Sequence, residues 1–272
     1  MNRPSKLVTA ARIVLGLIFV LSGLNHVFAL VPMPPMSGNT ALFWQGLDQT
    51  GYFLPLLGAI EVFAGALFLR GRWLPLALAI VAPIAINVAA FHAALAPEGL
   101  PIAALVLAAS GLLAWRHRQA FAPVLRARPA AAGGAARAVE LVVGLQFVLS
   151  GLLGLIGRTP PPSTPGAAVM MKGLAASGYF MPLLSAVLII AGALLASRRF
   201  VGLALWALAP LVVQILAYRL YVATPGMLVV GLALVAAEGW LAYHHREHFR
   251  AFFGGGSGGR TLAVAMPRAV AG

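Results

Sequence analysis

The sequence has no cysteine among its 272 residues. This absence excludes disulfide frameworks, thiol redox motifs, iron–sulfur clusters and thiolate metal sites as explanations of its function. Electron chemistry, if the protein takes part in any, therefore requires a cofactor or a partner protein.

Charged residues are also scarce. They make up 9% of the chain, whereas about a quarter is typical of globular proteins. Hydrophobic residues account for 61%, and the mean hydropathy is +0.94. This balance indicates an integral membrane protein.

Acidic residues in particular are few, since 6 Asp and Glu stand against 19 Lys and Arg and leave a net charge of +13. A basic excess of this size raises nucleic acid as a partner. The basic residues lie between apolar segments, however, where they orient a membrane protein and contact anionic lipid. The sequence therefore predicts a lipid bilayer as the partner and gives no reason to expect nucleic acid.

Long apolar segments dominate what is present. About 20 helical residues cross a hydrocarbon core of about 30 Å, and eight segments approach or exceed that length. They are 7–31, 52–69, 73–96, 100–115, 138–157, 179–196, 200–223 and 226–243. All but three of the 19 basic residues lie on one side of these segments, the exceptions being Arg158, Lys172 and Arg219. The sequence thus predicts an all-α protein with eight transmembrane helices and both termini in the cytoplasm.

The two halves of the chain repeat each other. GLIFVLSG at 16–23 matches GLQFVLSG at 144–151, and TGYFLPLL at 50–57 matches SGYFMPLL at 177–184. An even number of spans in each copy predicts two tandem four-helix bundles in parallel orientation. The predicted units are 7–121, a cytoplasmic linker at 122–137, a degenerate second unit at 138–253 and a disordered tail at 254–272.

A short apolar segment follows the first span in each half. ALFWQGL at 41–47 places Trp44 at headgroup depth, as an interfacial helix would. The alternative is one more stretch of helix that packs on the bundle and has no separate function.

Several polar residues lie within the spans of the first half. Glu61 is nine residues from Arg70, about 13 Å from the cytoplasmic boundary and near the middle of the membrane. Gly58 and Gly65 share its helix face, so Glu61 is predicted to face protein. The other candidates lie in the outer half or near the outer interface, and they are Asn25, His26, Asn87 and His92.

Glu61 and its candidate partners Asn25 and His26 disappear together in the second half. The positions aligned with all five candidates hold Leu153, Gly154, Leu188, Gln214 and Arg219. A lone leftover acid or imidazole would be an unpaired polar group in the bilayer, so the joint loss indicates one polar site in the first half. The alternative is that Glu61 is a structural hydrogen-bond anchor between helices.

Two metal-containing sites can be weighed against this interpretation. Haem ligation by His26 and His92 is disfavoured, because their estimated depths differ by about 10 Å and haem needs a roomy cavity. Met33 and Met36 are soft ligands that suit Cu(I), but methionine in an apolar loop is usually packing.

The remaining acids and histidines are expected to have no special role. Two acids near span ends are expected at the membrane interface, and they are Glu140 and Glu238. Four cytoplasmic histidines are expected only to add local polarity, and they are His117, His244, His245 and His248.

The first half carries a pattern of seven residues, which are Gly16, Phe19, Gly23, Glu61, Gly65, Gly71 and Arg72. In these residues it resembles the DoxX family of small four-span bacterial membrane proteins. The resemblance covers residues 12–121 strongly and 137–253 weakly. Many relatives have Lys where this sequence has His26, so the resemblance does not imply a Lys–Glu ion pair.

Members of that family are associated with membrane-bound oxidoreductase systems, so the resemblance implies a multi-pass protein of the bacterial cytoplasmic membrane that works with redox partner proteins. We therefore predict a membrane subunit or accessory of a quinone-linked redox system, with quinone as the candidate ligand near Glu61. The sequence holds no nucleophile–base constellation or nucleotide loop that would make it an enzyme on its own. The alternatives are a permease or exporter for a small metabolite and a non-catalytic assembly partner.

Overall fold

The computed structural model describes residues 5–32, 35–127 and 133–254, and every regular element within them is helical. The first half contains α1 (Lys6–Phe28), α2 (Gly38–Asp48), α3 (Phe53–Arg70), α4 (Leu74–Ala94), η1 (Pro97–Gly99), α5 (Leu100–Arg116) and α6 (Arg118–Phe121). The second half contains α7 (Gly134–Leu155), α8 (Pro165–Ala176), α9 (Phe180–Ala196), α10 (Val201–Tyr221), η2 (Pro225–Met227), α11 (Leu228–His244), η3 (Arg246–His248) and η4 (Arg250–Phe253).

The long helices match the predicted spans. Seven of those in the described residues are long and apolar enough to cross a membrane, and α8 and α9 pass the same test only when taken together. These two helices are bent by 94° at the break between them, so the described residues contain seven helices that could span a membrane, or eight if the bent pair is one span. An all-α, multi-pass membrane protein is therefore confirmed. The first span is shorter than predicted and ends at Phe28, because Ala29 adopts a left-handed conformation with φ of 48°.

The repeated motif that begins TGYF or SGYF forms a tight turn between a short outer helix and a span. The Thr50 hydroxyl donates to the carbonyl oxygen of Leu47 at 2.7 Å and accepts from the backbone N–H of Phe53 at 3.1 Å. Gly51 follows with φ of +69°, a conformation that favours glycine. Ser177 makes the same two bonds in the second half. The motif is thus repeated because each half makes the same sharp corner.

Glycines bring the first and third helices of the repeat into backbone contact. A Cβ on Gly23 in α1 would lie 2.5 Å from the carbonyl oxygen of Gly58 in α3, and a Cβ on Gly58 would lie 2.5 Å from that of Gly23. Gly16 and Gly65 make a second such contact about two helical turns away. Close approach through small residues is a common way for helices to associate in membranes. The corresponding contacts of α7 with α9 are at Gly144, Gly151, Ser185 and Gly192.

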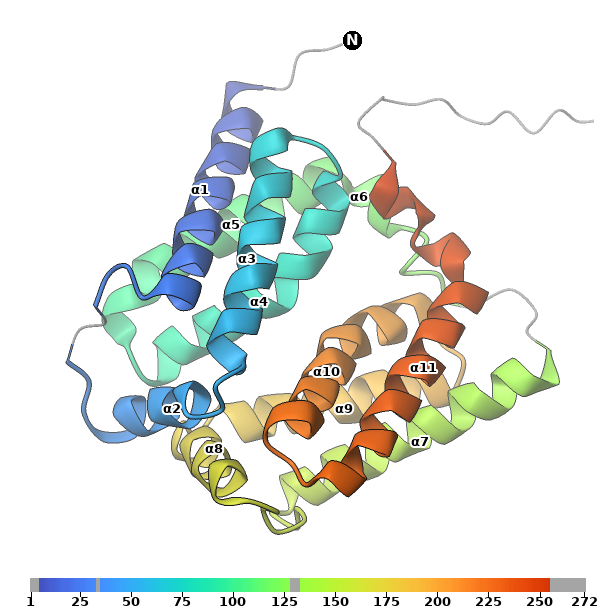
Figure 1. The fold of residues 1–272 in the computed structure, drawn as a ribbon. Helices are drawn as coiled ribbons and strands as arrows, with labels where there is room; N and C mark the ends of the chain where they lie inside the picture. Colours follow the sequence, from blue (N-terminus) through green and yellow to red (C-terminus); the bar gives the residue numbers. More distant parts are fainter. Residues whose placement is uncertain (1–4, 33–34, 128–132, 255–272) are drawn as a thin grey trace, which may run out of the picture.

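The two halves meet at two levels. At the outer end α2 and α8 lie side by side (Figure 1), with Gly46 directly against Gly173. A Cβ on Gly46 would lie 3.0 Å from the Cα of Gly173. Near the N-terminal ends of α4 and α10, Trp206 Nε1 donates to the carbonyl oxygen of Ala79 at 2.9 Å. The short helix containing Trp44 therefore packs between the two halves of the chain.

Candidate functional site

Glu61 and His26 form a side-chain pair between α3 and α1. The Oε2 atom of Glu61 lies 3.0 Å from Nδ1 of His26. The Glu61 side chain is 4% exposed and that of His26 is 17% exposed, so the carboxylate faces protein rather than lipid. Such a pair can hold a proton on either partner, because imidazole and carboxylate are both able to donate and accept when their protonation changes.

Helix geometry explains why these two side chains meet. Side chains on a helix lean toward its N-terminus. Because α1 and α3 are antiparallel, His26 in the last turn of α1 leans back toward the middle of that helix, and Glu61 in the middle of α3 leans toward the end of the bundle where α1 finishes. Gly58 leaves room for this approach, since a Cβ on it would lie 3.0 Å from the Cβ of His26.

The second half fills the same place with different residues. Leu188 replaces the acid, and Gly154 replaces the imidazole. The hydroxyl of Ser185, the counterpart of Gly58, lies 2.7 Å from where a Cβ of Gly154 would be. In the first half the glycine is on α3 and the larger residue, His26, is on α1. In the second half the glycine is on α7 and the larger residue, Ser185, is on α9, so no imidazole lies next to Leu188.

The other predicted site residues bond elsewhere. The Oδ1 atom of Asn25 accepts from the backbone N–H of Val31 at 2.7 Å and fixes the chain leaving α1. The Nδ1 atom of His92 lies 2.9 Å from the carbonyl oxygen of Ala96, where it closes the turn after α4. The structure thus brings Glu61 together with His26 but gives two of its predicted companions local roles.

Asn87 has a partner that belongs to the other half of the chain. The Tyr179 hydroxyl donates to Oδ1 of Asn87 at 3.3 Å. These residues are 92 positions apart, and no local pattern joins them. The second half is therefore more than a separate scaffold, because it contributes a side chain beside α4.

An aromatic cluster covers the outer side of the pair. The ring of Trp44 lies 6.2 Å from that of His26 and 5.8 Å from that of Phe91. Phe43 continues the cluster to Tyr179, with ring centroids 6.1 Å apart. Of the two predicted Cu(I) ligands, Met36 is half-buried, and Met33 lies outside the described residues.

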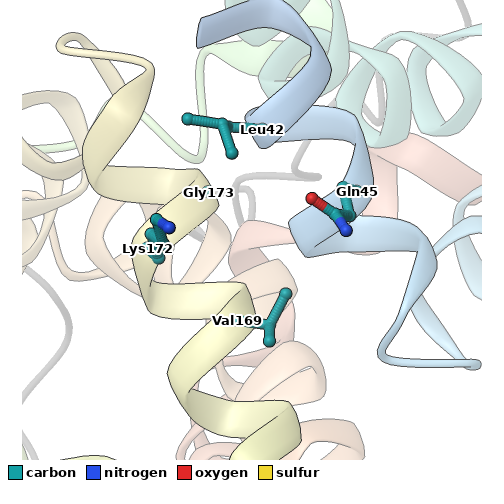
Figure 2. Close-up of a pocket in the computed structure, with 5 residues that line it drawn as sticks. All are labelled: Leu42, Gln45, Val169, Lys172 and Gly173. Carbon is teal, nitrogen blue, oxygen red and sulfur yellow. The ribbon is translucent and has the colours of Figure 1, made fainter. Parts of the chain in front are cut away.

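A small pocket opens between α2 and α8, apart from the pair. Its volume is about 160 Å³, and Figure 2 shows the residues that line it on the two facing helices. The pocket is lined by Leu42, Gln45, Val169, Lys172 and Gly173. It is therefore a feature of the seam between halves and not of the Glu61 carboxylate.

Two acids expected at the membrane interface are instead buried in protein. Glu140 is fully buried, with Oε1 2.7 Å from Nε2 of His245 and Oε2 2.7 Å from Nε of Arg198. Arg198 and Glu140 are close enough to form an ion pair, but Nε of Arg198 is not aligned with Oε2 of Glu140 for a hydrogen bond. Glu238 is 7% exposed. The expectation failed for Glu140 because the chain after α11 turns back over the start of α7.

The chain matches no protein-family model, no curated protein and no solved structure. The resemblance to the DoxX family therefore stays a prediction.

Proposed function

We propose that the protein is an integral membrane subunit of a quinone-linked redox system of the DoxX type, in which Glu61 and His26 exchange protons with a quinone. One observation carries the proposal. The buried carboxylate of Glu61 and the imidazole of His26 lie 3.0 Å apart inside a membrane helix bundle. The aligned positions of the second half hold Leu188 and Gly154 instead. Ionisable residues at such depth are costly to keep and are commonly functional.

The orientation of His26 supports a proton relay. Its Nδ1 atom faces Glu61, so Nε2 is the ring nitrogen left to meet a ligand. Oxidation of a quinol to a quinone releases two protons and two electrons. His26 would accept each proton at Nε2 and pass the Nδ1 proton to the Glu61 carboxylate, which returns it to the outer side. The electrons would pass to the redox centre of a partner protein.

The residues above the pair suit a flat ligand. Trp44 lies next to His26, and Phe91 lies against Trp44; aromatic rings of this kind stack well with planar ligands. The site would be reached from the bilayer, since quinones dissolve in the hydrocarbon phase. A membrane subunit of this kind needs no nucleotide or thiolate site of its own.

The test is quinone retention. The wild-type protein, purified in mild detergent, should yield quinone on solvent extraction, and Glu61→Gln and His26→Gln should each reduce the amount per chain by about 10-fold or more, the loss expected for a buried polar contact of about 1.4 kcal/mol or greater. Glu238→Gln is the matched control, because it alters a buried carboxyl in the other half. If the Glu61 and His26 variants lose thermal stability but keep wild-type quinone content, the pair is a structural anchor.

A further inference from the structure

A second polar cluster lies at the cytoplasmic end of the second half, well away from the aromatic outer end. The chain leaves α11 at His244 and makes the short turn η3. This turn gathers one ligand atom each from His245, Glu247 and His248, all within 4.8 Å of one another. Both imidazoles are almost completely buried, with side chains 2% and 1% exposed.

The tautomer of His245 is fixed by a buried carboxylate. Its Nε2 atom lies 2.7 Å from Oε1 of Glu140, and the other oxygen of Glu140 is paired with Arg198. An ionised carboxylate can only accept, so Nε2 of His245 carries the hydrogen. In the neutral ring the lone pair is then on Nδ1, which lies 3.9 Å from Oε1 of Glu247.

The tautomer of His248 is fixed in the same way by a carbonyl group. Its Nδ1 atom donates to the backbone oxygen of Pro123, so its lone pair is on Nε2. That atom is buried without a hydrogen-bond partner and lies 3.6 Å from Oε1 of Glu247. A buried nitrogen left unsatisfied costs about 1–3 kcal/mol, so its position calls for an explanation.

A bound metal ion would explain why Nδ1 of His245, Oε1 of Glu247 and Nε2 of His248 lie so close together. We propose that His245, Glu247 and His248 bind a divalent transition-metal ion of the Zn²⁺ class. Ligands about 2.0–2.2 Å from a tetrahedral ion stand about 3.4 Å apart, close to the 3.6 and 3.9 Å found here. Three protein ligands leave one position for water or another group. Imidazole suits zinc, copper, nickel or iron better than calcium or magnesium.

The surroundings of the two imidazoles match those of known metal sites. A metal-binding histidine usually donates its other ring N–H to a carboxylate or a backbone carbonyl, which sets the tautomer and the ring orientation. Here His245 has the carboxylate of Glu140, and His248 has the carbonyl of Pro123. Gly202 at the start of α10 leaves the space, since a Cβ on it would lie 3.0 Å from Nδ1 of His248.

The site is specific to the second half. Where that half has His245, Glu247 and His248, the first half has His117, Gln119 and Ala120. The buried acid is also missing, because Arg12 aligns with Glu140. Each half therefore holds its own polar site, and the metal site does not depend on the quinone proposal.

Metal content is the first measurement. The full chain is purified without a polyhistidine tag, incubated with Zn²⁺ or Co²⁺, dialysed and analysed for metal per chain. Wild type is expected to retain about one ion, and Co²⁺ should show the intense visible bands of a four-coordinate site. His248→Gln and Glu247→Ala should lose affinity by more than the roughly 10- to 100-fold that an outer-shell partner costs.

Two further variants separate binding from folding. His244→Gln is the matched control, since His244 is an exposed neighbour outside the cluster and should bind like wild type. Glu247 is 37% exposed, so Glu247→Ala should stay folded even if His248→Gln does not. Equal metal retention by wild type and Glu247→Ala would overturn the proposal and mark the ion as adventitious. A wild type that binds neither ion would also overturn it and leave Glu247 as an ion-pair partner of the histidines.

Discussion

The backbones of α1 and α3 touch at Gly23 and Gly58, where a Cβ on either residue would lie 2.5 Å from the carbonyl oxygen of the other. Moving α1 and α3 apart would also separate Glu61 from His26, because the Gly23–Gly58 contact lies next to that pair. The glycines therefore set the separation at which the acid and the imidazole bond. This relationship leads directly to a test.

Gly23→Ala should destabilise the protein by about 1–3 kcal/mol, the usual range for overpacking. The added methyl group has to displace the α3 backbone, so we also expect loss of any ligand that depends on the pair. Thermal unfolding in detergent measures the stability. Gly111→Ala in α5 is the control, because a Cβ there would meet nothing within 4 Å and should leave the melting temperature unchanged or higher. Equal melting temperatures for wild type and Gly23→Ala would show that the helices separate easily.

A double-mutant cycle should reveal coupling between Glu61 and His26. Either single change to Leu leaves a buried polar partner and should cost about 1–3 kcal/mol. The double variant leaves neither polar partner behind, as in the second half, where Leu188 and Gly154 replace the acid and the imidazole, and it should cost less than the sum of the two. We expect a coupling of about 0.5–3 kcal/mol in the free energy of unfolding. Additive single effects would mean that the 3.0 Å contact contributes nothing to stability.

Sequence periodicity and the repeat predicted the fold well because hydrophobic length and internal symmetry are local properties. They also predicted that Glu61 faces protein, since Gly58 and Gly65 mark the close side of its helix. The joint loss of Glu61 and His26 from the second half indicates one polar site, and the structure brings their side chains together. Function, substrate and family remain predictions.

The contacts that depend on long-range packing could not be read from the sequence. Depth along a helix does not say which neighbour a side chain meets, so Asn87 was grouped with Glu61 although it bonds Tyr179, 92 positions away. Glu140 was assigned to the interface because it lies near the end of a span. Its partner His245 is 105 positions away and is brought over it only by the turn after α11.

Removal of the Glu140 side chain should be among the most damaging single changes in the protein. Glu140→Ala leaves Arg198 without its ion-pair partner and His245 without its acceptor, and breaking a buried pair in this way costs about 3–5 kcal/mol. Glu98→Ala is the control, because Glu98 is exposed and its loss should change stability by less than about 0.5 kcal/mol. The measurement is the thermal unfolding of both variants in the same detergent. Similar melting temperatures for the two would show that Glu140 is not anchored as the distances imply.

His117 should make stability fall in mildly acidic solution. Burial, and then the neighbouring charge of Arg116, lower the pKa of His117 below its ordinary value of 6.5. The folded state therefore favours the neutral ring, and the unfolded state binds more protons. The contribution is fully present above about pH 6.5 and is lost as the pH falls from there through the folded-state pKa.

The comparison is between wild type and His117→Gln across the range from about pH 7.5 to pH 5, with the melting temperature as the readout. Other groups titrate in both proteins, so the difference between the two curves isolates His117. Wild type should lose more stability on acidification than the variant, because Gln cannot take up a proton. His244→Gln, which changes an exposed histidine, should follow the wild-type curve. Parallel curves for wild type and His117→Gln would show that protonation of His117 does not oppose folding.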